Sequence, residues 1–77
     1  VTLKNNSGSI IFVGKQNSDS STNKGTEISA GGTASWDCHY DAYIQRHSMN
    51  GGTNIYTTTS TKVYSENTGC GNTVNVN

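Results

Sequence analysis

The sequence predicts an all-β fold: a small antiparallel β-sandwich, or a small barrel, of about six to eight short strands. Forty of the 77 residues are Thr, Ser, Asn or Gly, types that favour strands and turns over helices. No window carries the i, i+3, i+4, i+7 apolar stripe of an amphipathic helix, and apolar residues instead recur at spacing two or in short runs. Turn signals interrupt the chain about every 8–12 residues, as in small all-β domains.

The first element expected is a strand at Val1–Leu3. The next residues, Asn5-Asn6-Ser7-Gly8, tolerate positive φ, so they predict a hairpin turn into a second strand at Ser9–Lys15, the most apolar run of the chain. Asn5 also begins the sequon Asn5-Asn6-Ser7, which in an exposed turn could accept a glycan. Residues 16–25 contain no apolar side chain and are therefore expected to form an exposed, mobile loop.

The middle of the chain predicts a short strand at Glu27–Ser29, a Gly31-Gly32 turn and a strand at Thr33–Tyr40. Because side chains alternate along a strand, this last strand has two expected faces. One would carry Trp36, Cys38 and Tyr40, and the other Asp37, His39 and Asp41.

The C-terminal half predicts four more strands and one strong hairpin signal. The signal is Asn50-Gly51-Gly52. The expected strands are Ala42–Ser48, Thr53–Thr59, Lys62–Glu66 and, at an edge, Thr73–Val76, with a loop at Asn67–Asn72. The chain has no Pro to blunt its edge strands, so polar side chains, or pairing with a second copy in a homo-oligomer, would protect them.

Length and composition predict a single secreted β domain over residues 1–77. A chain this short holds one core, and with 30% hydrophobic residues that core is thin. Two cysteines in such a chain predict a Cys38–Cys70 disulfide and an oxidising compartment. The start at Val1 suggests a mature product whose signal peptide has been removed. Five basic residues balance five acidic ones, which argues against a nucleic-acid partner, and no apolar run is long enough for a transmembrane segment.

Functional residue types gather between Trp36 and His47. These 12 residues hold the only Trp, the only Arg, both His, two of the three Asp and two of the four Tyr. A sugar needs planar hydrogen-bonding groups beside an aromatic ring, which this segment offers as Asp37, Asp41, Gln45 and Arg46 beside Tyr40, Tyr43 or Trp36. We therefore predict a carbohydrate site, and we expect Trp36 in the core and Tyr43, Tyr56 and Tyr64 in more exposed positions. The candidate ligand-binding residues are Asp37, His39, Asp41, Tyr43, Gln45 and Arg46.

Two other chemistries compete for the same segment. Asp37, His39 and Asp41 at alternate strand positions could share a metal ion, but spacing two is common on any polar strand face, and no metal or other cofactor is predicted. His39 and His47, with Glu27 or Glu66 and Arg46, could act as the acid, base and clamp of a small ribonuclease. The balanced charge argues against a phosphodiester substrate, which normally needs a basic cleft.

The opening Val1-Thr2-Leu3-Lys4-Asn5-Asn6-Ser7-Gly8 resembles the first hairpin of several small secreted β-sandwich families, among them the aegerolysins and the thaumatin-like proteins. Trp36-Asp37-Cys38 is also similar to a short aegerolysin segment. The chain is too short for either family, so we assign it to neither and carry over no residue role.

These observations predict a secreted, non-catalytic binding module with a glycan or another cell-surface molecule as its partner. Carbohydrate is the first expectation for the ligand. A small secreted toxin, elicitor or effector acting on a membrane or protein of another cell is the second, and a small hydrolase is the third.

Overall fold

The computed structural model describes residues 1–16 and 20–77. The described residues form seven strands and no helix, so the all-β prediction is confirmed. In chain order the strands are β1 (Thr2–Asn5), β2 (Ile11–Gly14), β3 (Thr26–Ile28), β4 (Thr33–Ser35), β5 (Ala42–Asn50), β6 (Thr53–Tyr64) and β7 (Thr73–Val76).

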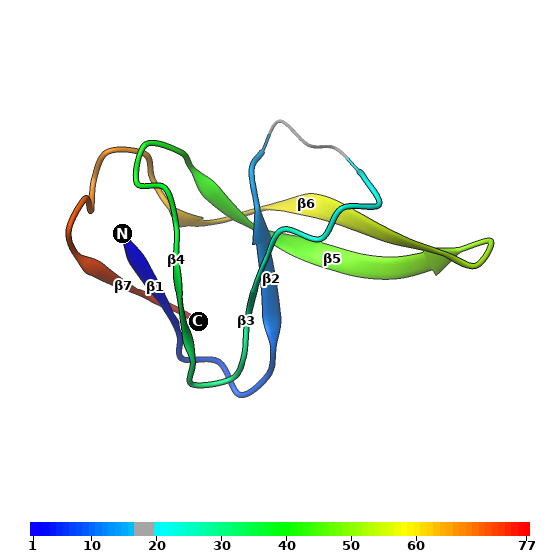
Figure 1. Ribbon diagram of the computed structural model, residues 1–77, viewed down its shortest axis with the longest axis horizontal. Coiled ribbons are helices and arrows are strands. Elements are labelled where there is room, and N and C mark those ends of the chain that lie inside the picture. The colour runs from blue at the N-terminus through cyan, green and yellow to red at the C-terminus, as the bar shows by residue number, and fades with distance from the viewer. Residues whose placement is uncertain (17–19) are drawn as a thin grey trace.

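The strands form two sheets. One has the order β4-β1-β7 and the other β3-β2-β5-β6 (Figure 1). All neighbouring pairs are antiparallel except β1 and β7, which run parallel. β7 lies at a sheet edge, as predicted; pairing of edges between copies stays a prediction.

The core lies between the sheets and is small. Leu3, Val13, Ile28, Ala42, Tyr64 and Val76 are its buried hydrophobic side chains. They come from β1, β2, β3, β5, β6 and β7, so every strand except β4 contributes one buried hydrophobic side chain. Tyr64 is only 4% exposed, and the expectation of an exposed role for it was wrong.

The predicted first hairpin is also wrong, because β1 and β2 belong to different sheets. The turn between them is built on the side chain of Asn5, which is fully buried. Its Nδ2 donates to the carbonyl oxygens of Ser9 (2.8 Å), Ile28 (2.9 Å) and Ser29 (3.2 Å), and its Oδ1 accepts from the backbone N–H of Ser7 (2.9 Å). Asn5 thus joins the crossover between the sheets to the end of β3. With Nδ2 buried and engaged, the folded chain has no place for a glycan at this sequon.

The hairpin of β5 and β6 is confirmed and is longer than expected. Gly51 and Gly52 have φ of 60° and 86°, the left-handed values that a tight two-residue turn requires. β6 continues without a break through the threonine-rich stretch, where two strands were predicted. The hairpin extends well beyond the rest of the molecule (Figure 1), whose principal extents are 40 × 26 × 17 Å. Residues 46–60 of this hairpin are called the arm below; its base packs on Phe12 of β2 through the rings of His47 and Tyr56, and its tip projects.

The loop after β2 is partly docked onto the arm. Ser21 pairs with Tyr56 through two backbone hydrogen bonds of 3.0 and 2.8 Å. Gly25 donates its N–H to Oε1 of Gln45 at 3.0 Å. The second half of the loop is exposed as expected, except that Ser21 is half-buried, but these bonds tie it to β5 and the arm. Residues 17–19 lie outside the described part of the chain.

Candidate functional site

The segment from Trp36 to Asp41 is a turn and not the predicted continuation of β4, which ends at Ser35. Asp37 explains the break, because its Oδ1 accepts the backbone N–H of His39 at 3.1 Å and its carbonyl accepts that of Tyr40 at 3.2 Å. Such local side-chain bonds compete with strand pairing. Trp36 then donates from Nε1 to the carbonyl of Tyr40 at 2.9 Å. Asp37, His39 and Asp41 consequently do not share a strand face.

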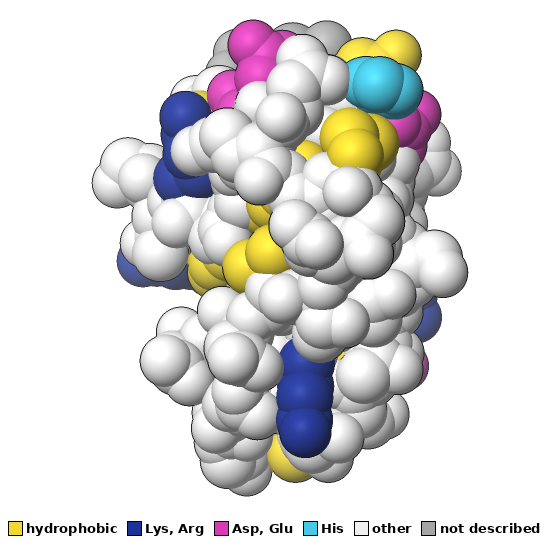
Figure 2. All heavy atoms as spheres, turned by 90° about the vertical axis from the view of Figure 1, so that its left-hand side faces the viewer, with side chains coloured by type: hydrophobic (Ala, Val, Ile, Leu, Met, Phe, Trp, Pro, Cys, Tyr) yellow, Lys and Arg dark blue, Asp and Glu magenta, His cyan; other side chains and the backbone are white. Residues whose placement is uncertain are grey.

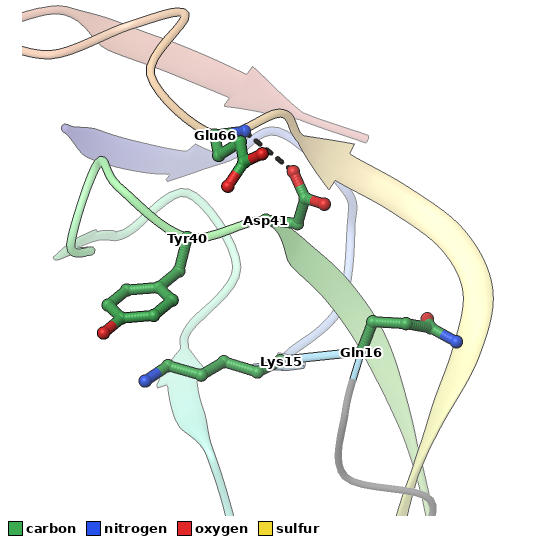
Figure 3. A pocket seen from close by; sticks show the side chains of 5 residues that line it. All are labelled: Lys15, Gln16, Tyr40, Asp41 and Glu66. Carbon is green, nitrogen blue, oxygen red and sulfur yellow. Dashed lines mark hydrogen bonds between the residues drawn. The ribbon is translucent and has the colours of Figure 1, made fainter.

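The turn presents Tyr40 at the surface, where the side chain is 45% exposed. Tyr40 lines an open hollow of about 170 Å³ together with Lys15, Gln16, Asp41 and Glu66, which we call the Tyr40 hollow (Figure 3). Nζ of Lys15 lies 3.7 Å from the centroid of the Tyr40 ring, a cation–π contact. The hollow therefore combines an accessible ring with a cation and two carboxylates.

The two carboxylates of the Tyr40 hollow, Asp41 and Glu66, differ in the hydrogen bonds and ion pairs that they form. Oδ1 of Asp41 accepts the backbone N–H of Glu66 at 2.8 Å, and its Oδ2 lies 3.5 Å from Nζ of Lys62. The Asp41 charge, followed by that of Tyr43, raises the pKa of Lys62. Within the described ranges, no hydrogen bond or ion pair engages the Glu66 carboxylate. Asp41 thus holds the local backbone, while Glu66 has its oxygens available.

A second hollow, of about 390 Å³, shares Lys15 with the first. We call it the Trp36 hollow, since Trp36 lines it together with polar groups from the docked loop and β5, namely Ser21, Asn23, Lys24 and Gln45. Trp36 is half-buried and packs against the core, so the core prediction for it is only partly right. Lys24 forms an exposed ion pair with Glu27 at 2.8 Å, and the hydrogen bond to Glu27 raises the pKa of Lys24.

The structure separates the six predicted ligand-binding residues into several places. Asp41 lines the Tyr40 hollow and Gln45 the Trp36 hollow, but Gln45 is only 7% exposed and is engaged by Gly25. Tyr43 is half-buried on β5, with Nζ of Lys62 5.7 Å from its ring centroid. Arg46 follows Gln45 directly, so it points to the opposite face of the sheet. There it lines a separate hollow with residues 57–60 of β6.

Asp37 and His39 lie beside the disulfide, which is confirmed by the Sγ–Sγ bond of 2.07 Å between Cys38 and Cys70. Nδ1 of His39 is 2.7 Å from Oδ1 of Asn67. The other histidine, His47, belongs to the arm, where it stacks on Tyr56 with ring centroids 5.0 Å apart. Each histidine thus has its own separate surroundings, which lends no support to an acid–base pair.

From the sequence, Tyr40 was one of three rings weighed for the sugar but was not among the six candidate residues, Glu66 was named only as a hydrolase acid, and Lys15 and Gln16 were not considered for a ligand site. Tyr40 sits inside the functionally dense segment, and the Asp37 turn that exposes it was the available signal. Lys15 and Glu66 stand far from that segment in the chain, and only the tertiary fold brings them beside it (Figure 3).

One face of the molecule is mostly uncharged polar side chains and backbone, with scattered charges and a narrow band of hydrophobic side chains (Figure 2). Among the described residues there is no helix able to cross a membrane. Comparisons with protein-family models, with curated proteins and with solved structures gave no match for this chain.

Proposed function

We propose that this protein is a secreted, non-catalytic module that binds carbohydrate through the Tyr40 and Trp36 hollows. The observation that carries the proposal is the exposed Tyr40 ring beside two carboxylates and a lysine in an open hollow. An aromatic face takes the apolar side of a sugar ring, while planar polar groups take its hydroxyls. The disulfide supports an oxidising, extracytoplasmic setting.

The size and arrangement of the hollows favour part of a glycan chain over an enclosed small molecule. The Tyr40 hollow, about 170 Å³, is smaller than the ~300–1,000 Å³ of typical small-molecule pockets. It therefore suits one ring of a longer chain. Because the Trp36 hollow also reaches Lys15, a chain lying over Lys15 would meet both aromatic side chains.

Binding is expected to be independent of calcium. The Asp41 oxygens already serve the Glu66 backbone and Lys62, which leaves Glu66 as the one carboxylate of the Tyr40 hollow with uncommitted oxygens among the described residues. A single carboxylate is a poor site for Ca²⁺, which takes six to eight oxygen ligands.

The test is a glycan and polysaccharide array run with calcium and again with chelator, followed by titration of the best ligand into variants. Tyr40→Ala and Glu66→Gln remove the ring and the free charge, and both side chains lie at the surface. Met49→Ala is the matched control, since Met49 is 62% exposed on the arm, away from both hollows. We expect Tyr40→Ala to weaken binding at least tenfold, about 1.4 kcal/mol, and Met49→Ala to leave it unchanged.

A secreted toxin, elicitor or effector is the second candidate, and the arm favours it. The arm projects from the sandwich and carries Met49, an exposed and adaptable apolar side chain. A blank array, together with liposome or partner-protein binding that Met49→Ala weakens, would favour this candidate over carbohydrate binding.

A further inference from the structure

A second cluster of functional side chains lies outside the two hollows, at the disulfide. The two sulfurs of Cys38 and Cys70 and a ring nitrogen of His39 lie within 4.8 Å of one another. Two sulfurs and an imidazole nitrogen are ligands that zinc prefers. In the oxidised chain the sulfurs bond to each other, so the cluster binds no metal in this form.

The loop that carries Cys70 is held beside Cys38 by bonds other than the disulfide. The carbonyl oxygen of Cys38 accepts the backbone N–H of Asn67 at 2.7 Å and the hydroxyl of Tyr64 at 2.8 Å. The same Tyr64 hydroxyl accepts the N–H of Gly69 at 3.2 Å, and the Tyr64 side chain is buried. These contacts would keep the two thiols as neighbours after the disulfide is reduced.

His39 is oriented independently of the sulfurs as well. An amide oxygen only accepts, so the 2.7 Å contact with Oδ1 of Asn67 places the ring proton on Nδ1. Nε2 then keeps the free lone pair that a metal needs, and the partner on Nδ1 fixes the ring as outer partners of metal-bound histidines do. Oδ1 of Asp37 holds the His39 backbone at 3.1 Å.

We propose that Cys38, His39 and Cys70 form a Zn²⁺ site when the disulfide is reduced. A dithiol reductant supplies two electrons and two protons, which convert the disulfide to two thiols while the reductant forms its own disulfide. Binding of Zn²⁺ then releases the two thiol protons, and water completes the four-coordinate site. Cys70 is exposed, so the reductant can reach its sulfur. The disulfide and the metal are alternative links between the same two segments.

The experiment uses the full chain, reduced with a dithiol, desalted without oxygen and titrated with Co²⁺ as a coloured substitute for Zn²⁺. We expect one equivalent to bind with a thiolate charge-transfer band, Zn²⁺ to displace it, and the oxidised chain to bind none. His39→Ala should weaken binding at least tenfold. His47→Ala is the control and should bind like the parent, because His47 lies on the arm against Tyr56.

If reduction unfolds the chain, circular dichroism recorded during the titration still tests the proposal. Refolding on addition of one equivalent of metal, lost in His39→Ala, supports the site. Equal binding by the oxidised chain, equal affinity of His39→Ala and the parent, or no stoichiometric binding by the reduced chain would each overturn the proposal.

Discussion

Replacing Asn5 by Asp tests the buried amide that joins the two sheets. The two side chains have the same shape, but the carboxylate has no N–H to donate to the carbonyl oxygens of Ser9, Ile28 and Ser29. The carbonyl oxygens of Ser9 and Ser29 keep one donor each, the Ser7 hydroxyl (2.9 Å) and the Gly32 N–H (2.8 Å). The carboxylate itself is left buried against carbonyl oxygens without a donor between them, and each buried polar group that loses its partner costs about 1–3 kcal/mol. With the two N–H donors of the amide lost, we expect Asn5→Asp to lower the free energy of unfolding by roughly 2–6 kcal/mol at neutral pH. The whole free energy of unfolding of a small protein is only about 5–15 kcal/mol.

The loss of stability in Asn5→Asp should be larger at pH 7 than at pH 4. Burial against carbonyl oxygens raises the folded-state pKa of the new carboxyl above its unfolded value of about 3.9. The folded state then holds a proton that the unfolded state has lost, so the variant becomes less stable as pH rises from about 4 to 7. Near pH 4 the protonated carboxyl is neutral and has one O–H group that can donate to a carbonyl oxygen.

Urea unfolding followed by the fluorescence of the single tryptophan, Trp36, measures the effect at both pH values. Asn6→Asp is the matched control, because Asn6 is the exposed neighbour and should change stability by less than about 0.5 kcal/mol. Equal losses of stability in the two variants, or an equal loss in Asn5→Asp at pH 4 and pH 7, would refute this role of the buried Asn5 amide.

Two further changes test the disulfide and the docked loop. Cys70→Ser opens a link between residues 32 positions apart, so we expect it to lower stability by about 2–5 kcal/mol; urea midpoints equal to those of the parent would contradict this. Gly25→Ala would place a Cβ against the carbonyl oxygen of Val13 and 2.9 Å from Oε1 of Gln45, whereas Gly8→Ala meets nothing within 4 Å. Thermal melts should therefore show a clear drop for Gly25→Ala alone, and equal melts would count against the docked loop.

Much of the fold was predictable because its signals are local. Alternating apolar residues and the Asn50-Gly51-Gly52 turn predict the β5–β6 hairpin, and two cysteines in a chain with a thin core predict the disulfide. The prediction of a first hairpin at Asn5 was wrong because the same residues suit a hairpin turn and a crossover between sheets equally well. Burial of the Asn5 amide against β3, and the parallel pairing of β1 with β7, depend on contacts between distant segments.

The two hollows overlap the predicted segment without matching its candidate residues one by one, and ligand binding by any of them stays a prediction. Asp41 and Gln45 line the two hollows, as the dense segment suggested. The strand expected through Trp36 and Tyr40 is a turn, so the assignment of faces was wrong and the exposed ring is Tyr40. Arg46 points away from Gln45 for a simple reason, the alternation of side chains along β5.

Affinity of Tyr40→Ala for the glycan that the parent binds best is the most direct measurement of the central claim. We expect Tyr40→Ala to melt like the parent and to bind at least tenfold more weakly, Met49→Ala to bind like the parent, and chelator to have no effect. Equal affinity of Tyr40→Ala and the parent, or a parent that binds no glycan on the array, would contradict it.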